Sequence, residues 1–210
     1  MILGTGGLGR ETLWAFDERS DVHVRGFLTN AREEHGNEVC GLPVLGDESW
    51  LVDQPEVEVV CAIGDPRARR DLVGTLAARG VRFASAVHPS VVCSAFVELG
   101  PGCIVGSRAV LTTQVRVGDH VVIGVGAVLS HDCVVEDFAT LAPGCVLTGR
   151  TRIGELAELG AGVTLIPGSR VGRGAFVGAL AAVVEDVPPN TVSAGVPARV
   201  LRTLPESEQV

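Results

Sequence analysis

The sequence predicts two domains: a small Rossmann-like α/β domain in residues 1–85, then a parallel β-helix of hexapeptide repeats in residues 86–210, which include a C-terminal tail. Three observations predict this fold class. A six-residue pattern runs without insertion from His88 to Val183, strand-like and helix-like segments alternate before it, and a glycine-rich turn follows the first short apolar segment.

The first 85 residues alternate between strand and helix patterns, which favours a small parallel sheet. Asp65 is the expected N-cap of the longest helix and Gly80 its C-cap. The expected elements are a strand at 1–3, a helix after the glycines at 4–9, a strand at 24–28, a loop at 41–51 leading into a short helix, a buried strand at 56–64, a helix at 65–80 and a strand at 81–87.

The repeat comprises sixteen hexads between residues 88 and 183. The sixth position is Leu, Ile or Val in all of them but one, where Cys93 stands, and the fourth position is always small or apolar. Two positions that lie two apart share one face of a strand, so both should point into a core. Positions one to three turn a corner, helped by glycine where the backbone needs unusual φ and ψ angles. The first position is glycine in eight hexads. Three strands and three corners close a coil of eighteen residues, and about five coils stack into a prism.

The glycine loop consists of Gly4, Thr5, Gly6, Gly7, Leu8 and Gly9 and matches G-x-G-x-x-G. The dinucleotide-binding interpretation also needs an acidic residue about twenty positions later. Thr29 and Asn30 stand there instead, which argues against bound NAD. The loop is then either a tight strand–helix turn or a helix N-terminus that holds a phosphate. A positive φ at Gly6 would make a larger residue there strained.

Composition restricts the function classes. The net charge is −8 and all 17 basic residues are arginine, so a nucleic-acid binder is not expected, although arginines can still form local phosphate sites. No apolar run approaches membrane-spanning length and no secretion signal opens the chain, so we expect a cytoplasmic protein without a membrane partner. No CxxC pair occurs, and Cys93, Cys103, Cys133 and Cys145 fall on the repeat, so buried thiols are expected.

Both halves resemble one family, the sialic acid O-acetyltransferase and nucleotide-sugar N-acetyltransferase group of hexapeptide-repeat acyltransferases. The resemblance covers nearly the whole chain and rests on GTGGLGRE, GLPVLGD, AIGDPRARR, the AVHPS junction, SHDCVVEDF, APGCVLTG and GVPARV. It implies a left-handed β-helix, acetyl-CoA bound to the prism and a nucleotide sugar bound to the small domain. It also implies a homotrimer with active sites between neighbouring prisms.

His131 is the second residue of its hexad, so it should lie at a corner and point outward. Its neutral form is available near pH 7, where it could take a proton from an attacking amine or hydroxyl, although a surface histidine is often only solvated. The matching histidine of the family is the general base. Asp132 could orient the ring or stabilise its protonated form, or be a solvated corner residue.

The family resemblance implies further site residues. An N–H group near Gly149 should stabilise the oxyanion. Ala161, Gly178 and Ala179 match positions that hold acetyl-CoA through main-chain groups, and Arg199 would meet a CoA phosphate or cap the prism. The glycine loop and Asn30 would bind the acceptor. One departure is Ser130, which stands where related sequences often have an acidic residue.

Several functions remain open at the level of sequence. An N-acetyltransferase for a nucleotide-linked amino sugar leads, and an O-acetyltransferase for sialic acid, another sugar or a small-molecule hydroxyl follows. A metal enzyme of the carbonic anhydrase type would need three converging histidines, and His88, His120 and His131 are not spaced by multiples of the coil, so no metal is expected. A non-catalytic binding module with the same fold is the remaining alternative.

Overall fold

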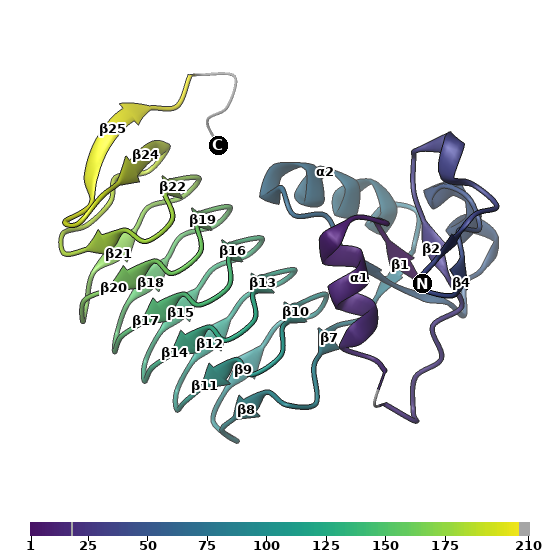
Figure 1. Cartoon of the computed structure of the whole chain (residues 1–210), viewed down its shortest axis with the longest axis horizontal. Coiled ribbons are helices and arrows are strands. Elements are labelled where there is room, and N and C mark those ends of the chain that lie inside the picture. The colour runs from purple at the N-terminus through teal and green to yellow at the C-terminus, as the bar shows by residue number, and fades with distance from the viewer. Residues whose placement is uncertain (18, 206–210) are drawn as a thin grey trace.

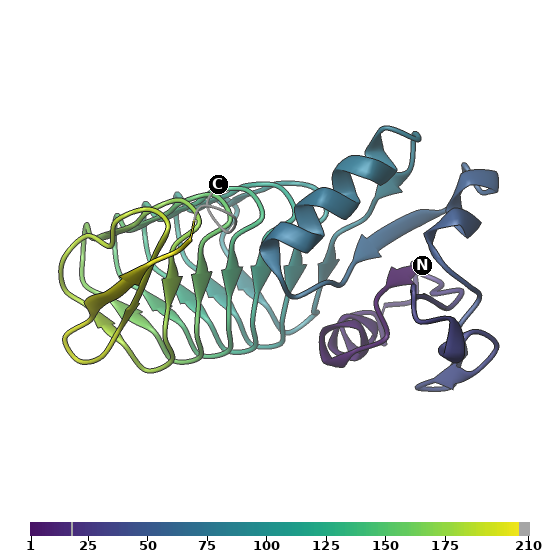
Figure 2. The same ribbon diagram turned by 90° about the horizontal axis from the view of Figure 1, so that it is seen from above.

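The computed structural model describes residues 1–17 and 19–205. A small sheet flanked by helices lies beside one end of a long three-faced β-helix (Figure 1). Figure 2, from above, shows the coils of the β-helix stacked along one axis with α2 alongside them. The expected order of a small α/β unit followed by a hexapeptide prism is therefore confirmed.

The small sheet is parallel and has the strand order β2-β1-β5-β6. Its strands are short but their side chains are largely buried, so their pattern is that of a sheet covered on both sides. Its elements are β1 (Ile2–Leu3), α1 (Gly7–Trp14), β2 (Phe27–Leu28), β5 (Glu58–Cys61), α2 (Pro66–Ala77) and β6 (Arg82–Phe83). Asp65 caps α2 as predicted, since its Oδ1 accepts the N–H of Ala68 at 2.7 Å.

The segment between β2 and β5 contains the expected short helix, as a 3₁₀ helix, and in addition a hairpin that was not predicted. It contains an antiparallel hairpin of β3 (Glu38–Val39) and β4 (Leu42–Pro43), flanked by the 3₁₀ helices η1 (Arg32–Glu34) and η2 (Glu48–Asp53). Cys40 and Gly41 connect the two strands with φ of 49° and 78°. Two left-handed residues form the turn that matches the twist of a hairpin.

The β-helix has three faces, each built from every third strand. The docked face, which carries the small domain, consists of β7 (Ala86–Val87), β10 (Ile104–Val105), β13 (Val122–Ile123), β16 (Thr140–Leu141), β19 (Glu158–Leu159), β22 (Phe176–Val177) and β24 (Thr191–Ala194), with β25 (Arg199–Thr203) added antiparallel at its end. The valine face, named for its outward side chains, consists of β8 (Val92–Cys93), β11 (Val110–Leu111), β14 (Val128–Leu129), β17 (Val146–Leu147), β20 (Thr164–Leu165) and β23 (Ala182–Val183). The charged face consists of β9 (Glu98–Leu99), β12 (Arg116–Val117), β15 (Val134–Val135), β18 (Arg152–Ile153) and β21 (Arg170–Val171).

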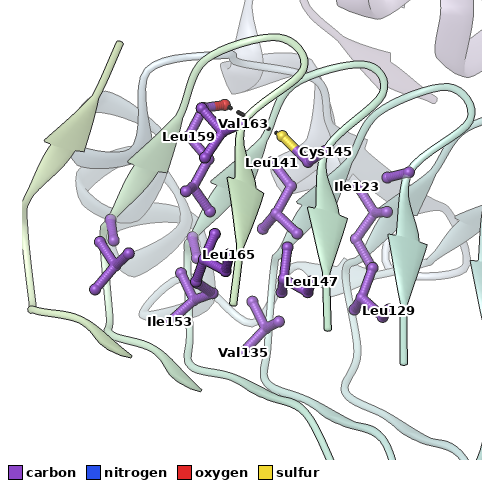
Figure 3. Packing of buried hydrophobic residues seen from close by; sticks show 14 of the residues in the cluster. Ile123, Leu129, Val135, Leu141, Cys145, Leu147, Ile153, Leu159, Val163 and Leu165 are labelled. Carbon is purple, nitrogen blue, oxygen red and sulfur yellow. Dashed lines mark hydrogen bonds between the residues drawn. The ribbon is translucent and has the colours of Figure 1, made fainter. Parts of the chain in front are cut away.

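The core of the prism follows the repeat. Sixth-position side chains such as Leu141 and Leu147 are fully buried and stack on their equivalents in neighbouring coils (Figure 3). Each such side chain contributes roughly 1.5–3 kcal/mol by leaving water. Cys103, Cys133 and Cys145 are buried as expected, and burial raises the pKa of the Cys145 thiol to about 11.

Cys93 is the exception, because its thiol is exposed. It lies in the first coil, where no further coil covers the end of the prism, and Phe96 in the same coil is also exposed. The prediction of four buried repeat cysteines was therefore wrong for the terminal one. A repeat pattern specifies an inward direction, but burial also needs a neighbour on each side.

The glycines of the repeat have two roles, and the predicted one, unusual backbone angles at the corners, is confirmed for those at the third position of the hexad, such as Gly102 and Gly126. The left-handed backbone falls on the third position of the hexad, which has positive φ in every hexad from Gly102 to Leu180. The first-position glycines instead allow close approach of adjacent coils; a Cβ on Gly106 would lie 2.8 Å from the backbone nitrogen of Val125. Their role is steric, not conformational.

The small domain is fixed to the docked face. Ala15, after α1, shares a buried cluster with Ile104 and Val122 of the prism. β6 pairs with β5 of the small sheet, whereas β7 pairs with β10 of the prism, so we propose the domain boundary at residues 85–86. Within residues 1–17 and 19–205, neither helix has the length and apolar character needed to cross a membrane.

Candidate active site

His131 lies at the corner between the valine face and the charged face, which we call the His131 corner. The coil geometry places it there, because β14 ends at Leu129 and the next strand begins at Val134. Asp132 follows in a left-handed conformation with φ of 61°, which turns its side chain beside the ring. The two side chains are each 52% exposed, and His131 Nδ1 lies 2.8 Å from Asp132 Oδ2.

This contact assigns the tautomer of His131. An ionised carboxylate only accepts hydrogen bonds, so the proton of the neutral ring belongs on Nδ1. The lone pair is then on Nε2, which has no hydrogen-bond partner in the described part of the chain. The ring is thus oriented with its basic nitrogen free, as a general base requires.

Gly149 lies directly against the ring from the next coil. A Cβ at this position would overlap ring atoms Cε1 and Nε2 of His131, so only glycine leaves room for the imidazole. The backbone carbonyl of His131 accepts the N–H of Arg150 at 2.9 Å, which holds the two coils in register. The N–H of Gly149 has no acceptor among the described residues and can donate to a ligand.

Ala161, Gly178 and Ala179 lie together at a different corner, between the docked face and the valine face, which we call the Ala161 corner. The main chain of Gly178 is engaged in the prism, because its N–H donates to Ser193 O at 2.8 Å and its carbonyl accepts from Ala181. The N–H groups of Ala161 and Ala179 have no acceptors among the described residues. Those two groups are the ones available to a donor molecule.

Arg199 begins β25 at the far end of the prism. Its guanidinium lies 3.5 Å from Glu185 and also donates to the carbonyl of Ala198 at 3.0 Å. The structure therefore places Arg199 in the contacts that close the end of the β-helix.

The glycine loop follows β1 at the carboxyl edge of the small sheet, and Asn30 follows the neighbouring strand β2. β2 lies on one side of β1 and β5 on the other, so the order in which strands are added to the sheet reverses at β1. Ligands of open α/β sheets bind at such a point. Gly6 is the N-cap of α1 and has no side-chain cap, which leaves free N–H groups at the start of the helix.

The glycines of this loop have distinct roles. Gly4 has φ of 115° and a Cβ there would lie 2.7 Å from the carbonyl oxygen of Ala62. A Cβ on Gly9 would overlap the carbonyl oxygen of Gly4. Gly6 has φ of −67° and open space around it, so the expectation of strain at Gly6 does not apply. The structural constraint lies on Gly4 and Gly9.

The structure does not bring all the sequence-predicted residues together within one chain. His131, Asp132 and Gly149 form one group, while the residues of the Ala161 corner and the glycine loop lie on other sides of the prism. The three histidines of the metal alternative also separate: His88 lies at the Ala161 corner, His120 between the charged and docked faces, and His131 at its own corner. Within one chain they are therefore too far apart to bind one metal ion, and residues 1–17 and 19–205 contain no cluster of three or more metal-ligating side chains.

Two family models match the chain: the PglD N-terminal domain over residues 1–76 and the bacterial transferase hexapeptide (six repeats) over residues 114–149. Among solved structures, a perosamine N-acetyltransferase from Caulobacter crescentus, with one histidine replaced by asparagine and with CoA and GDP-perosamine bound, is 32% identical with a TM-score of 0.90. The match covers 96% of this chain and 95% of that one. This chain belongs to the hexapeptide-repeat acyltransferase family.

Other solved members agree with this assignment. The acetyltransferase domain of PglB from Neisseria gonorrhoeae, in complex with acetyl coenzyme A, is 30% identical with a TM-score of 0.88, and the match covers 95% of this chain and 97% of that one. WeeI from Acinetobacter baumannii is 27% identical with a TM-score of 0.86, over 95% and 98% of the two chains. The comparison with curated proteins gives no match. The coils of this acyltransferase correspond to the left-handed β-helix of the family.

Arg69 is a residue of this acyltransferase whose importance the sequence analysis missed. It is fully buried between α2 and the prism, and no carboxylate of residues 1–17 and 19–205 forms an ion pair with it. Its guanidinium donates to the carbonyls of Ile63 at 2.7 Å, His120 at 3.0 Å and Phe138 at 2.6 Å. Burial lowers the pKa of Arg69 to about 10. A signal existed, because Arg69 falls on the buried face of α2 with Pro66, Val73 and Leu76.

Proposed function

We propose that this protein transfers the acetyl group of acetyl-CoA to the amine of a nucleotide-linked amino sugar, with His131 as the general base. Membership of the acyltransferase family supports the reaction class. Relatives at least 30% identical over nearly the whole chain were solved with CoA or acetyl-CoA, and one of them also with GDP-perosamine. The observation that carries the proposal is the group formed by His131, Asp132 and Gly149.

The reaction is a direct transfer within a ternary complex. The amine of the acceptor attacks the thioester carbonyl carbon while His131 Nε2 takes its proton. The tetrahedral oxyanion then accepts a hydrogen bond from the free N–H of Gly149. When the C–S bond breaks, the imidazolium returns the proton to the leaving sulfur, so acetylated amine and CoA are formed and His131 is regenerated. Asp132 stabilises the imidazolium through Nδ1.

We further propose that the active enzyme is a homotrimer. The His131 corner and the Ala161 corner lie on opposite edges of the valine face, and the glycine loop belongs to the domain on the docked face. A site that uses all three groups needs a second chain. Cyclic assembly would place the His131 corner of one chain beside the Ala161 corner and small domain of the next.

The valine face supports such an assembly. Val92, Val110, Val128 and Val146 point outward from neighbouring strands, and no element of the described chain covers them. Their exposure falls from 62% at Val92 to an intermediate level along the row. A contiguous apolar strip of this kind on a β-sheet is typical of a protein interface.

The acceptor would bind at the carboxyl edge of the small sheet. Free N–H groups at the start of α1 and the positive end of its dipole suit a diphosphate, and Asn30 lies at the end of the adjacent strand. The missing acidic residue after β2 argues against NAD, which leaves an activated sugar as the ligand that the loop fits best.

A panel of acceptors with acetyl-CoA tests the proposal, with release of the CoA thiol and the mass of the product as readouts. The panel contains nucleotide-linked amino sugars, the same amino sugars without the nucleotide, sialic acid and simple hydroxyl compounds. We expect acetylation of a nucleotide-linked amino sugar at nitrogen. Turnover confined to hydroxyl acceptors would replace the proposal by the O-acetyltransferase alternative, and no thiol release with any acceptor would favour the binding module.

A further inference from the structure

The charged face carries one pair of like charges in register. Arg152 of β18 and Arg170 of β21 are Cα partners, so their side chains leave the same face of the sheet about 4.8 Å apart. Like charges directly opposite each other destabilise a sheet. Among the described strands no other register pair joins two side chains of the same charge.

Neither guanidinium is neutralised by a neighbouring acid. No ion pair of Arg152 or Arg170 is found within residues 1–17 and 19–205. The nearby carboxylates are engaged elsewhere: Asp186 accepts the backbone N–H of Arg170 at 2.9 Å, and Glu155 Oε2 lies 3.2 Å from Arg173. Glu136 accepts the backbone N–H of Glu155 at 3.0 Å. Both arginines therefore keep their hydrogen-bond donors free.

Arg116, another outward-pointing arginine of the charged face, differs from Arg152 and Arg170. It also points outward from the charged face, but its guanidinium lies 3.3 Å from Glu98, its register partner on β9. The charged face thus has an arginine paired with an acid in a coil before His131, and two arginines without an ion pair among the described residues in the coils after it. Arg150, at the corner beside Gly149, adds a third exposed guanidinium for which no ion pair is found among the described residues.

We propose that Arg152 and Arg170, together with Arg150, bind phosphate groups of acetyl-CoA. This inference rests on the proposed function, which places the thioester between His131 and Gly149. Arg170 lies two coils beyond His131, roughly 10 Å along the axis and a similar distance across the face. The pantetheine arm of CoA spans such a distance in an extended conformation, so the phosphates reach the arginine pair when the thioester is in place.

The chemistry of the pair suits this ligand. A guanidinium binds phosphate oxygens through two parallel hydrogen bonds, and it remains charged at every physiological pH. CoA carries a diphosphate and a 3′-phosphate, so it can neutralise several arginines at once. Repulsion between Arg152 and Arg170 in the free enzyme is relieved on binding, which favours the complex.

Calorimetry with three donors tests the assignment: acetyl-CoA, 3′-dephospho-acetyl-CoA and acetyl-pantetheine. The double variant Arg152→Gln/Arg170→Gln should weaken acetyl-CoA binding by about tenfold to a hundredfold, because a hydrogen bond to a charged group contributes about 1.5–3 kcal/mol. Turnover with acetyl-pantetheine should not change, since it has no phosphate. Arg116→Gln, the matched control on the same face, should bind acetyl-CoA like the wild type.

The other outcomes are also decisive. Wild-type affinity of the double variant for acetyl-CoA overturns the assignment, and so does an equal loss with acetyl-pantetheine. A raised acceptor KM with unchanged donor affinity would assign the arginines to the acceptor diphosphate and also overturn it. The Tm of the double variant should equal or exceed that of the wild type, which shows that it is folded. If the wild type does not bind acetyl-CoA, the proposed acetyltransferase function is itself contradicted.

Discussion

Gly149 and His131 occupy equivalent corner positions in successive coils, and the absence of a side chain on Gly149 is what makes room for the imidazole of His131. The same glycine presents an N–H group without an acceptor in the described part of the chain. One position therefore sets the place of the base and supplies the oxyanion donor.

Gly149→Ala should lower kcat by about a hundredfold, because its Cβ would displace the ring and misplacement by about 1 Å can cost that much. Stability should change little, since the corner is at the surface of the prism and the ring can move outward. Steady-state kinetics and thermal unfolding check both. Thr113→Ala, one coil before His131 at the same corner, is the matched control and should keep full activity. Activity of Gly149→Ala within twofold of the wild type would contradict the geometry.

Gly6→Val should raise the KM for the acceptor by about tenfold or more and leave the Kd for acetyl-CoA unchanged. Gly6 has φ of −67° with no atom near its missing side chain, so the variant should fold, and the added isopropyl group would block approach of a phosphate to the start of α1. Gly74→Ala on α2, equally open, is the control. An acceptor KM indifferent to Gly6→Val would reduce the loop to a structural turn.

Val128→Asp should dissociate the trimer, because it places a charge on the apolar strip of the valine face. Val134→Asp, on the charged face of the same coil and similarly half-buried, should leave the assembly intact. Light scattering measures the mass of both variants. Activity should be lost in Val128→Asp, since the proposed site needs two chains, whereas Val134→Asp is a control for mass alone because its register partner is Arg152. A fully active wild-type monomer would contradict the trimer.

Acid should destabilise the junction between the domains through His120. Its ring stacks on Phe138 and meets Phe83 edge-on, and burial, followed by the charge of Arg69, lowers its pKa, while Asp137 opposes the shift. Below about pH 6.5 the unfolded chain then binds a proton that the folded chain resists, so stability falls as pH falls. Tm should therefore drop more steeply between pH 7.5 and pH 5 for the wild type than for His120→Phe. Equal slopes of Tm against pH would contradict the role of His120.

The repeat made most of the fold predictable, because a strict period of six fixes which side chains of every strand enter the core. Features that depend on neighbours were not predictable in this way. Leu156 and Leu180 adopt positive φ because the coil imposes it at the third position, not because their residue type favours it. Cys93 carries the repeat pattern, but no coil covers it.

The candidate site likewise has parts that the repeat predicts and parts that depend on residues distant in the chain. The corner position of His131 and the contact with Asp132 follow from the hexad, since their place in the chain determines the direction of both side chains. The role of Arg69 does not, because its acceptors on the prism, the carbonyls of His120 and Phe138, lie 51 and 69 residues away in the chain. The arginine pair of the charged face appears only when residues eighteen apart are placed side by side.

The central claim is that His131 takes the proton of the acceptor amine, and turnover of His131→Ala tests it most directly. With acetyl-CoA and the best nucleotide-linked amino sugar both saturating, kcat should fall by about 10²–10⁴, the usual contribution of a general base. The Kd for acetyl-CoA should stay at the wild-type value, which shows that the donor site is intact. A kcat within a few-fold of the wild type would contradict the mechanism.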